Sequence, residues 1–86
     1  MKQILVVDDE PDARAWLELV LKRHGYHPYL AGDGTAALEL LQANRIDLIL
    51  ADVAMPGLNG YQLCQLVKTS DRPDWALISP IIFYST

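Results

Sequence analysis

Short, continuous apolar runs recur along this chain and alternate with segments in which apolar residues return every three or four positions. The runs are Ile4–Val7, Tyr26–Ala31, Leu48–Ala51 and Ile81–Tyr84. Runs of this length, rich in β-branched residues, are typical of strands buried on both faces. Strands that alternate with helices favour a parallel sheet. The sequence therefore predicts an α/β fold, a doubly wound parallel sheet with helices on both faces.

Three intervening segments have the signals of helices. The first begins at Pro11, ends before Gly25, and carries five residues on one predicted apolar face: Ala13, Trp16, Leu17, Val20 and Leu21. On this pattern Trp16 is expected to be a partly buried core residue. The second follows the turn and cap residues Asp33-Gly34-Thr35, and the third begins near Gly60. Pro28 lacks a backbone donor, which predicts that its strand lies at an edge of the sheet.

Composition narrows the function classes. Eighty-six residues allow a single domain, and an apolar content of 51% is enough to form a core. The formal net charge of −4 argues against a nucleic-acid or anionic-membrane surface, since both require basic residues. The lone Cys64 suggests a reducing compartment, and neither a signal peptide nor a membrane-length apolar run is present. We therefore expect a cytoplasmic domain.

Three aspartates follow predicted strands directly. Asp8 and Asp9 come after the first apolar run, and Asp52 comes after the third. Ligands of open α/β sheets bind beyond the carboxyl ends of the strands, where the strand order reverses. If the first and third strands are neighbours, the three carboxylates converge there. Their mutual repulsion would be relieved by a hard divalent cation, typically Mg²⁺. The sequence therefore predicts a magnesium site.

These residues, with two further stretches, resemble the receiver domain of two-component response regulators. The resemblance is carried by Val6–Glu10, by the loop Asp52–Gly60 with its D-x-x-M-P pattern, and by Pro80–Ser85. It implies a flavodoxin-like (CheY-like) fold with strand order 2-1-3-4. It also implies that residues 1–86 are the N-terminal portion of one receiver domain, without the last helix, strand and helix of the family fold.

The resemblance also implies roles for individual residues. Asp52 would be the phosphoacceptor, taking a phosphoryl group from a sensor histidine kinase or a phosphotransfer protein. Asp8, Asp9, Asp52 and the backbone carbonyl of Ala54 would hold Mg²⁺. Ser85 would be the switch hydroxyl that bonds a phosphoryl oxygen. Such a domain is not an enzyme but a signalling module that assists its own phosphoryl transfer and hydrolysis.

One departure from the family pattern leaves a second reading open. The family places a lysine after a fifth strand, whereas the lysines of this sequence are Lys2, Lys22 and Lys68. A cation beside the transferring phosphoryl group is a major stabilising term. The alternative is therefore a truncated receiver that is incompetent for phosphorylation and acts as a self-associating fold fragment. Its partner would be a second copy, in a homodimer through the exposed fourth strand at 81–84.

The remaining residue patterns are weaker indications of function. His24, His27 and Cys64 have no structural-zinc spacing and lack a fourth ligand. A haloacid-dehalogenase-like phosphatase would need an acid two residues after its nucleophile, where this chain has Ala54. Trp75 is expected to be a packed loop residue.

Overall fold

The computed structural model describes residues 2–52, 60–72, 75, 78 and 81–84, and these form a four-stranded sheet with three helices. The strands are β1 (Gln3–Val7), β2 (His27–Ala31), β3 (Leu48–Asp52) and β4 (Ile81–Tyr84). The helices are α1 (Pro11–Arg23), α2 (Gly34–Ala43) and α3 (Gly60–Thr69).

All described strand pairs are parallel, and the strand order is β2-β1-β3-β4. The predicted fold class and strand order are therefore confirmed. Strand β2, which contains Pro28, lies at one edge, as the proline predicted, and β4 lies at the other. Val7 is opposite Ala31 on one side and Ala51 on the other, so β1, β2 and β3 end level with one another.

The helix boundaries follow local chemistry. Pro11 opens α1, where its missing N–H is not needed. Asp33 caps α2, because its Oδ1 accepts a hydrogen bond of 2.8 Å from the backbone N–H of Ala36. Gly25 adopts a φ of 81° just after α1, a conformation in the left-handed region that glycine tolerates best. These signals account for the agreement between the predicted and observed starts of α1 and α2 and the end of α1.

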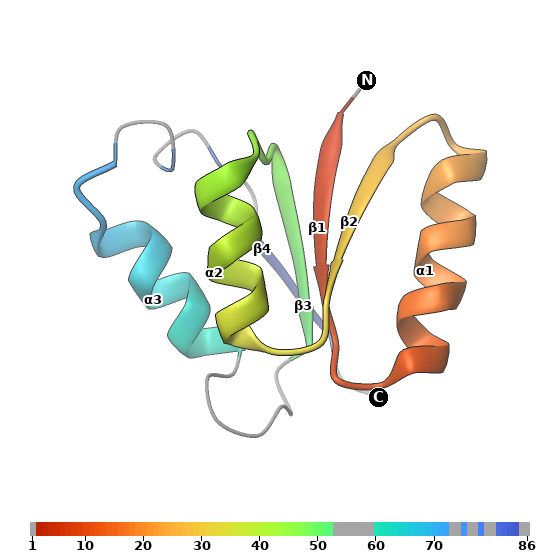
Figure 1. The fold of residues 1–86 in the computed structure, drawn as a ribbon, viewed down its shortest axis with the longest axis horizontal. Helices are drawn as coiled ribbons and strands as arrows, with labels where there is room; N and C mark the ends of the chain where they lie inside the picture. The colour runs from red at the N-terminus through yellow and green to blue at the C-terminus, as the bar shows by residue number, and fades with distance from the viewer. Residues whose placement is uncertain (1, 53–59, 73–74, 76–77, 79–80, 85–86) are drawn as a thin grey trace.

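The helices divide between the two faces of the sheet. Helix α1 lies on one side, and α2 and α3 lie on the other (Figure 1). The larger hydrophobic cluster lies under α2 and α3 and includes Leu5, Leu41, Ile49 and Leu63. The smaller cluster under α1 is built on Ile4, Val6 and Leu21. Strand β1 therefore contributes alternate residues to both clusters, as expected for a strand buried on both faces.

The two tryptophans differ in their surroundings. Trp75 is only 7% exposed, so the prediction of a packed residue is confirmed. The prediction for Trp16 is wrong, because this side chain is 63% exposed. Leu17 and Leu21 pack toward the sheet, and each residue of an α-helix turns about 100° from the one before it, which carries Trp16 away from that face.

Within the part of the chain that the structure describes, none of the helices has the length and apolar character needed to cross a membrane.

Candidate functional site at the carboxyl ends of β1 and β3

Asp8, Asp9 and Asp52 meet at the carboxyl ends of β1 and β3. Each offers a carboxylate oxygen, and these oxygens all lie within 4.8 Å of one another. Asp8 and Asp52 are buried, with exposed fractions of 0% and 1%, whereas Asp9 is exposed. Because β1 and β3 are adjacent, the predicted convergence of the three carboxylates is observed.

The position of this cluster follows from the topology. From β1 the chain crosses to β2 on one side, whereas β3 lies on the other side of β1, so the strand order reverses between β1 and β3. This reversal leaves a crevice beyond the strand ends, the usual ligand site of open α/β sheets.

The backbone holds Asp8 from several directions. Its N–H donates to the carbonyl of Ala31 at 3.0 Å, which ties the end of β1 to the end of β2. Its carboxylate Oδ1 accepts from the N–H of Glu10 at 2.9 Å, a turn that leads the chain into α1. The buried carboxylate therefore has a constrained orientation before any ligand binds.

The donor set fits Mg²⁺. This cation prefers oxygen ligands at 2.0–2.1 Å in an octahedral shell, so opposite ligands lie about 4.2 Å apart. Adjacent ligands of the same shell lie about 3 Å apart, so the three carboxylate oxygens, which all lie within 4.8 Å of one another, would move closer together around the ion. Two buried carboxylates and an exposed one, gathered at this spacing, also repel one another unless a cation lies between them. The residues present therefore suit a magnesium ion.

Arg14 is a part of this region that sequence reasoning missed. Its Nη1 donates to the carbonyl oxygen of Asp8 at 2.7 Å, which joins the first turns of α1 to the end of β1. A Cβ at Gly32 would lie 3.0 Å from the same Nη1, so the glycine leaves room for the guanidinium. A signal was available: a cation near the N-terminus of a helix opposes the helix dipole, so Arg14 is poorly explained by helix stability.

Two predicted site residues, Ala54 and Ser85, lie outside the described residues. The roles that the resemblance implied for them are not tested by this geometry.

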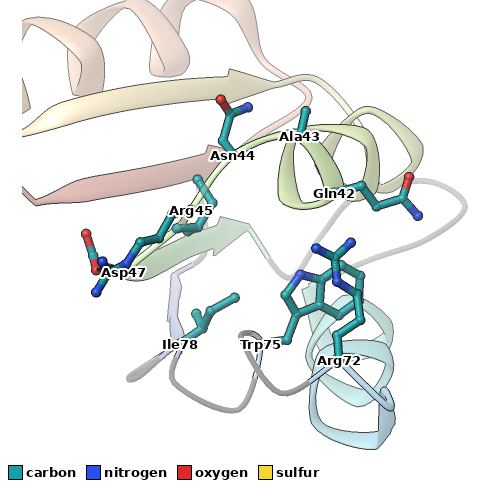
Figure 2. A pocket seen from close by; sticks show the side chains of 9 residues that line it. Gln42, Ala43, Asn44, Arg45, Asp47, Arg72, Trp75 and Ile78 are labelled. Atoms are coloured by element: carbon teal, nitrogen blue, oxygen red, sulfur yellow. Dashed lines mark ion pairs between the residues drawn. The ribbon is translucent and has the colours of Figure 1, made fainter.

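A further hollow lies at the opposite end of β3. It has a volume of about 270 Å³ and is lined by residues from the end of α2 through Asp47, together with Arg72, Trp75 and Ile78 (Figure 2). The guanidinium of Arg72 lies 4.8 Å from the centre of the Trp75 ring, and the indole N–H donates to the carbonyl of Leu41 at 3.4 Å. These contacts secure the segment after α3 to α2, and this hollow is separate from the acidic cluster.

Comparison with known proteins defines the class. The family model of the response regulator receiver domain matches residues 4–86, so the chain belongs to this family. The fold and the acidic crevice described above agree with that assignment.

Two curated relatives illustrate the similarity. The chain is 39% identical over 67 residues to the DNA-binding response regulator MtrA of Mycolicibacterium smegmatis, covering 78% of this chain and 29% of that protein. It is 48% identical over 73 residues to the probable transcriptional regulator ycf27 of Cyanophora paradoxa, covering 84% of this chain and 30% of that protein. The chain thus spans less than a third of the length of these relatives.

Solved structures agree on the fold. The N-terminal domain of a response regulator receiver protein from Methanoculleus marisnigri matches with a TM-score of 0.87 at 35% identity, over 96% of this chain and 65% of that one. The receiver domain of the sensor histidine kinase PA1611 from Pseudomonas aeruginosa matches with a TM-score of 0.83 at 30% identity, over 95% and 65%. In that structure a magnesium ion is coordinated in the active-site cleft.

Proposed function

We propose that this chain is a phosphoacceptor in a two-component phosphorelay and that Asp52 takes the phosphoryl group. The observation that carries the proposal is the gathering of Asp8, Asp9 and Asp52 oxygens within 4.8 Å at the ends of two buried strands. Membership of the receiver family supports a phosphohistidine as the donor, on a sensor histidine kinase or a phosphotransfer protein.

The proposed transfer is a substitution at phosphorus. A carboxylate oxygen of Asp52 forms a bond to phosphorus while the P–N bond of the phosphohistidine breaks. The electron pair of that bond stays on the imidazole nitrogen, which can take up a proton, and the product is an acyl phosphate. Such transfers depend mainly on positioning and on stabilisation of charge, which the rigid ends of β1 and β3 would provide.

Asp8, Asp9 and Asp52 would hold Mg²⁺, together with the backbone carbonyl of Ala54 that the family resemblance adds. When bound, this cation offsets the negative charge of the phosphoryl oxygens and of the surrounding carboxylates. The magnesium ion in the PA1611 receiver structure supports this choice of cofactor. Ser85 is the residue we propose for the hydroxyl contact with the phosphoryl group.

The alternative is a receiver fragment that binds the cation but does not accept the phosphoryl group. It is favoured by one observation: within residues 1–86 the lysines are Lys2, Lys22 and Lys68, which all precede β4. In either case we propose a cytoplasmic protein, for which the lone Cys64 is the supporting feature.

The test is intact-mass measurement after incubation with Mg²⁺ and acetyl phosphate. We expect wild type to gain one phosphoryl group and Asp52→Asn to gain none. Asp71→Asn is the matched control, since Asp71 is exposed and lies after α3, at the other end of the domain.

Magnesium binding, measured by calorimetry, separates the two candidate functions. Binding of Mg²⁺ with no mass gain would establish the incompetent fragment. A mass gain that persists in Asp52→Asn would rule out Asp52 as the acceptor.

A further inference from the structure

Arg14 joins the end of β1 to the residue that follows β2. It is the fourth residue of α1 and is half-buried. Its Nη1 donates to the carbonyl oxygen of Asp8 at 2.7 Å, a length typical of a strong hydrogen bond from a charged donor. The same guanidinium lies against Gly32, where an added Cβ would be 3.0 Å from Nη1 and 3.5 Å from Cζ. One side chain of α1 therefore contacts the ends of two neighbouring strands, at the β2 side of the sheet (Figure 1).

Gly32 is explained by this contact and not by its backbone conformation. Among the glycines that the structure describes, Gly25 is the one with a positive φ, so the backbone at position 32 does not itself require glycine. The three atoms nearest to an added Cβ at position 32 all belong to Arg14. The glycine therefore keeps space for the guanidinium.

The hydrogen bond from Arg14 fixes the peptide group between two aspartates of the acidic cluster. A peptide group is planar, so the carbonyl of Asp8 and the N–H of Asp9 turn as one unit. The N–H of Asp8 is held separately by the carbonyl of Ala31 at 3.0 Å. The peptide groups before and after Asp8 therefore both have fixed orientations, and these determine the directions in which Asp8 and Asp9 carry their carboxylates.

We propose that Arg14, in the space left by Gly32, is a positioning residue that sets the relative orientation of the Asp8 and Asp9 carboxylates for binding of Mg²⁺. This cation demands near-octahedral geometry, so its affinity depends on the directions from which the ligands approach. Groups that orient metal ligands without touching the metal typically change its affinity by about ten- to a hundredfold. Arg14 acts in this way through the main chain.

Arg14 has two effects on the affinity for Mg²⁺, and they have opposite signs. Its positive charge repels a divalent cation, so removal of the charge alone would raise the affinity. Loss of the hydrogen bond frees the peptide group between Asp8 and Asp9, which would lower the affinity. Because the guanidinium is half-buried, solvent screens part of its charge, and we expect the positioning effect to be larger. The sign of the change therefore identifies the mechanism.

Calorimetric titration with Mg²⁺ tests this role, at a temperature at which circular dichroism shows every variant to be folded. We expect the dissociation constant to rise roughly tenfold in Arg14→Met and roughly threefold in Gly32→Val, whose side chain would displace the guanidinium. Arg23→Met is the matched control. It removes the same charge from the last turn of the same helix, where Arg23 is exposed, and should leave the affinity as in wild type.

A double substitution separates the contact from a general loss of structure. In the Arg14→Met background, Gly32→Val should change the dissociation constant by less than about twofold, because the contact that it disturbs is already absent. Three results would overturn the inference and leave the metal site standing: a higher affinity in Arg14→Met, full additivity of the two substitutions, or an equal loss in Arg23→Met.

The inference rests on the metal site of the proposed function and not on phosphoryl transfer to Asp52. If wild type bound no Mg²⁺, the inference and that metal site would fail together. If wild type bound Mg²⁺ with the expected response to the Arg14 and Gly32 substitutions but gained no phosphoryl group, the inference would hold and the phosphoacceptor function would fail.

Discussion

The described residues bury the two faces of the sheet to different degrees. Under α2 and α3, side chains from strands, helices and the segment after α3 form one continuous cluster that includes Leu5, Leu41, Leu63 and Trp75. Under α1, the buried residues of the described cluster are Ile4, Val6 and Leu21. The contrast indicates that, among the described residues, most of the buried core lies under α2 and α3.

The difference has a topological cause. The connections from β2 to β3 and from β3 to β4 run over the α2/α3 face, whereas only the connection from β1 to β2 runs over the other (Figure 1). Crossovers between parallel strands are right-handed, so the direction of each step across the sheet decides which face its helix covers. Among the helices that the structure describes, α1 alone lies on this face.

The largest expected effect on stability comes from comparing two variants, each of which truncates a leucine on one face of the sheet. Leu63→Ala should lower the free energy of unfolding by about 2–5 kcal/mol, because Leu63 is fully buried and its cavity cannot be refilled. Leu50→Ala should cost only about 1–2 kcal/mol, because Leu50 is half-buried.

Urea denaturation at low protein concentration measures both variants. Equal losses for both leucines at low concentration would show that the faces do not differ as described.

Arg14 tests how the α1 side supports the acidic site. Arg14→Met should destabilise the fold by about 1.5 kcal/mol, since it removes the charged donor to the Asp8 carbonyl. We also expect the affinity for Mg²⁺ to fall by roughly tenfold, as for other outer groups that orient metal ligands. Calorimetric titration with Mg²⁺ checks this, and Arg14→Lys should recover part of the loss. Unchanged affinity in Arg14→Met would mean that Asp8 is positioned without the guanidinium.

A smaller effect distinguishes the starts of α1 and α2. Asp33→Ala should cost about 1 kcal/mol, because the side chain accepts the Ala36 N–H at the start of α2. Glu10 occupies the corresponding position before α1 without a side-chain cap hydrogen bond, so Glu10→Ala should change stability by less than about 0.5 kcal/mol. Thermal unfolding of both variants provides the measurement. A larger loss of stability for Glu10→Ala than for Asp33→Ala would contradict the view that only the start of α2 is stabilised by a side-chain cap.

Local signals account for the parts of the fold that the sequence predicted. The apolar runs, the cap at Asp33, the glycine at 25 and the proline at 28 each act within a few residues, and the structure has the expected strand, helix or edge at each. The gathering of Asp8, Asp9 and Asp52 was also predictable, because parallel strands end at the same side of a sheet.

Contacts between residues far apart in the sequence could not be predicted from such local signals. The place of the Arg14 guanidinium against Gly32 depends on how α1 sits over the end of β2, and the Trp75 hydrogen bond to Leu41 joins residues 34 positions apart. The exposure of Trp16 depends on the rotation of α1 about its axis, which packing of Leu17 and Leu21 decides.

The sequence by itself thus determined the order of the elements, the edge position of β2 and the three acids at the strand ends, since period, caps and turns are short-range. Only the tertiary structure decided how the described helices divide between the two faces, that Trp16 and Leu19 are exposed, and how Arg14 reaches Asp8. These depend on the summed packing of whole elements, in which no single residue carries the signal.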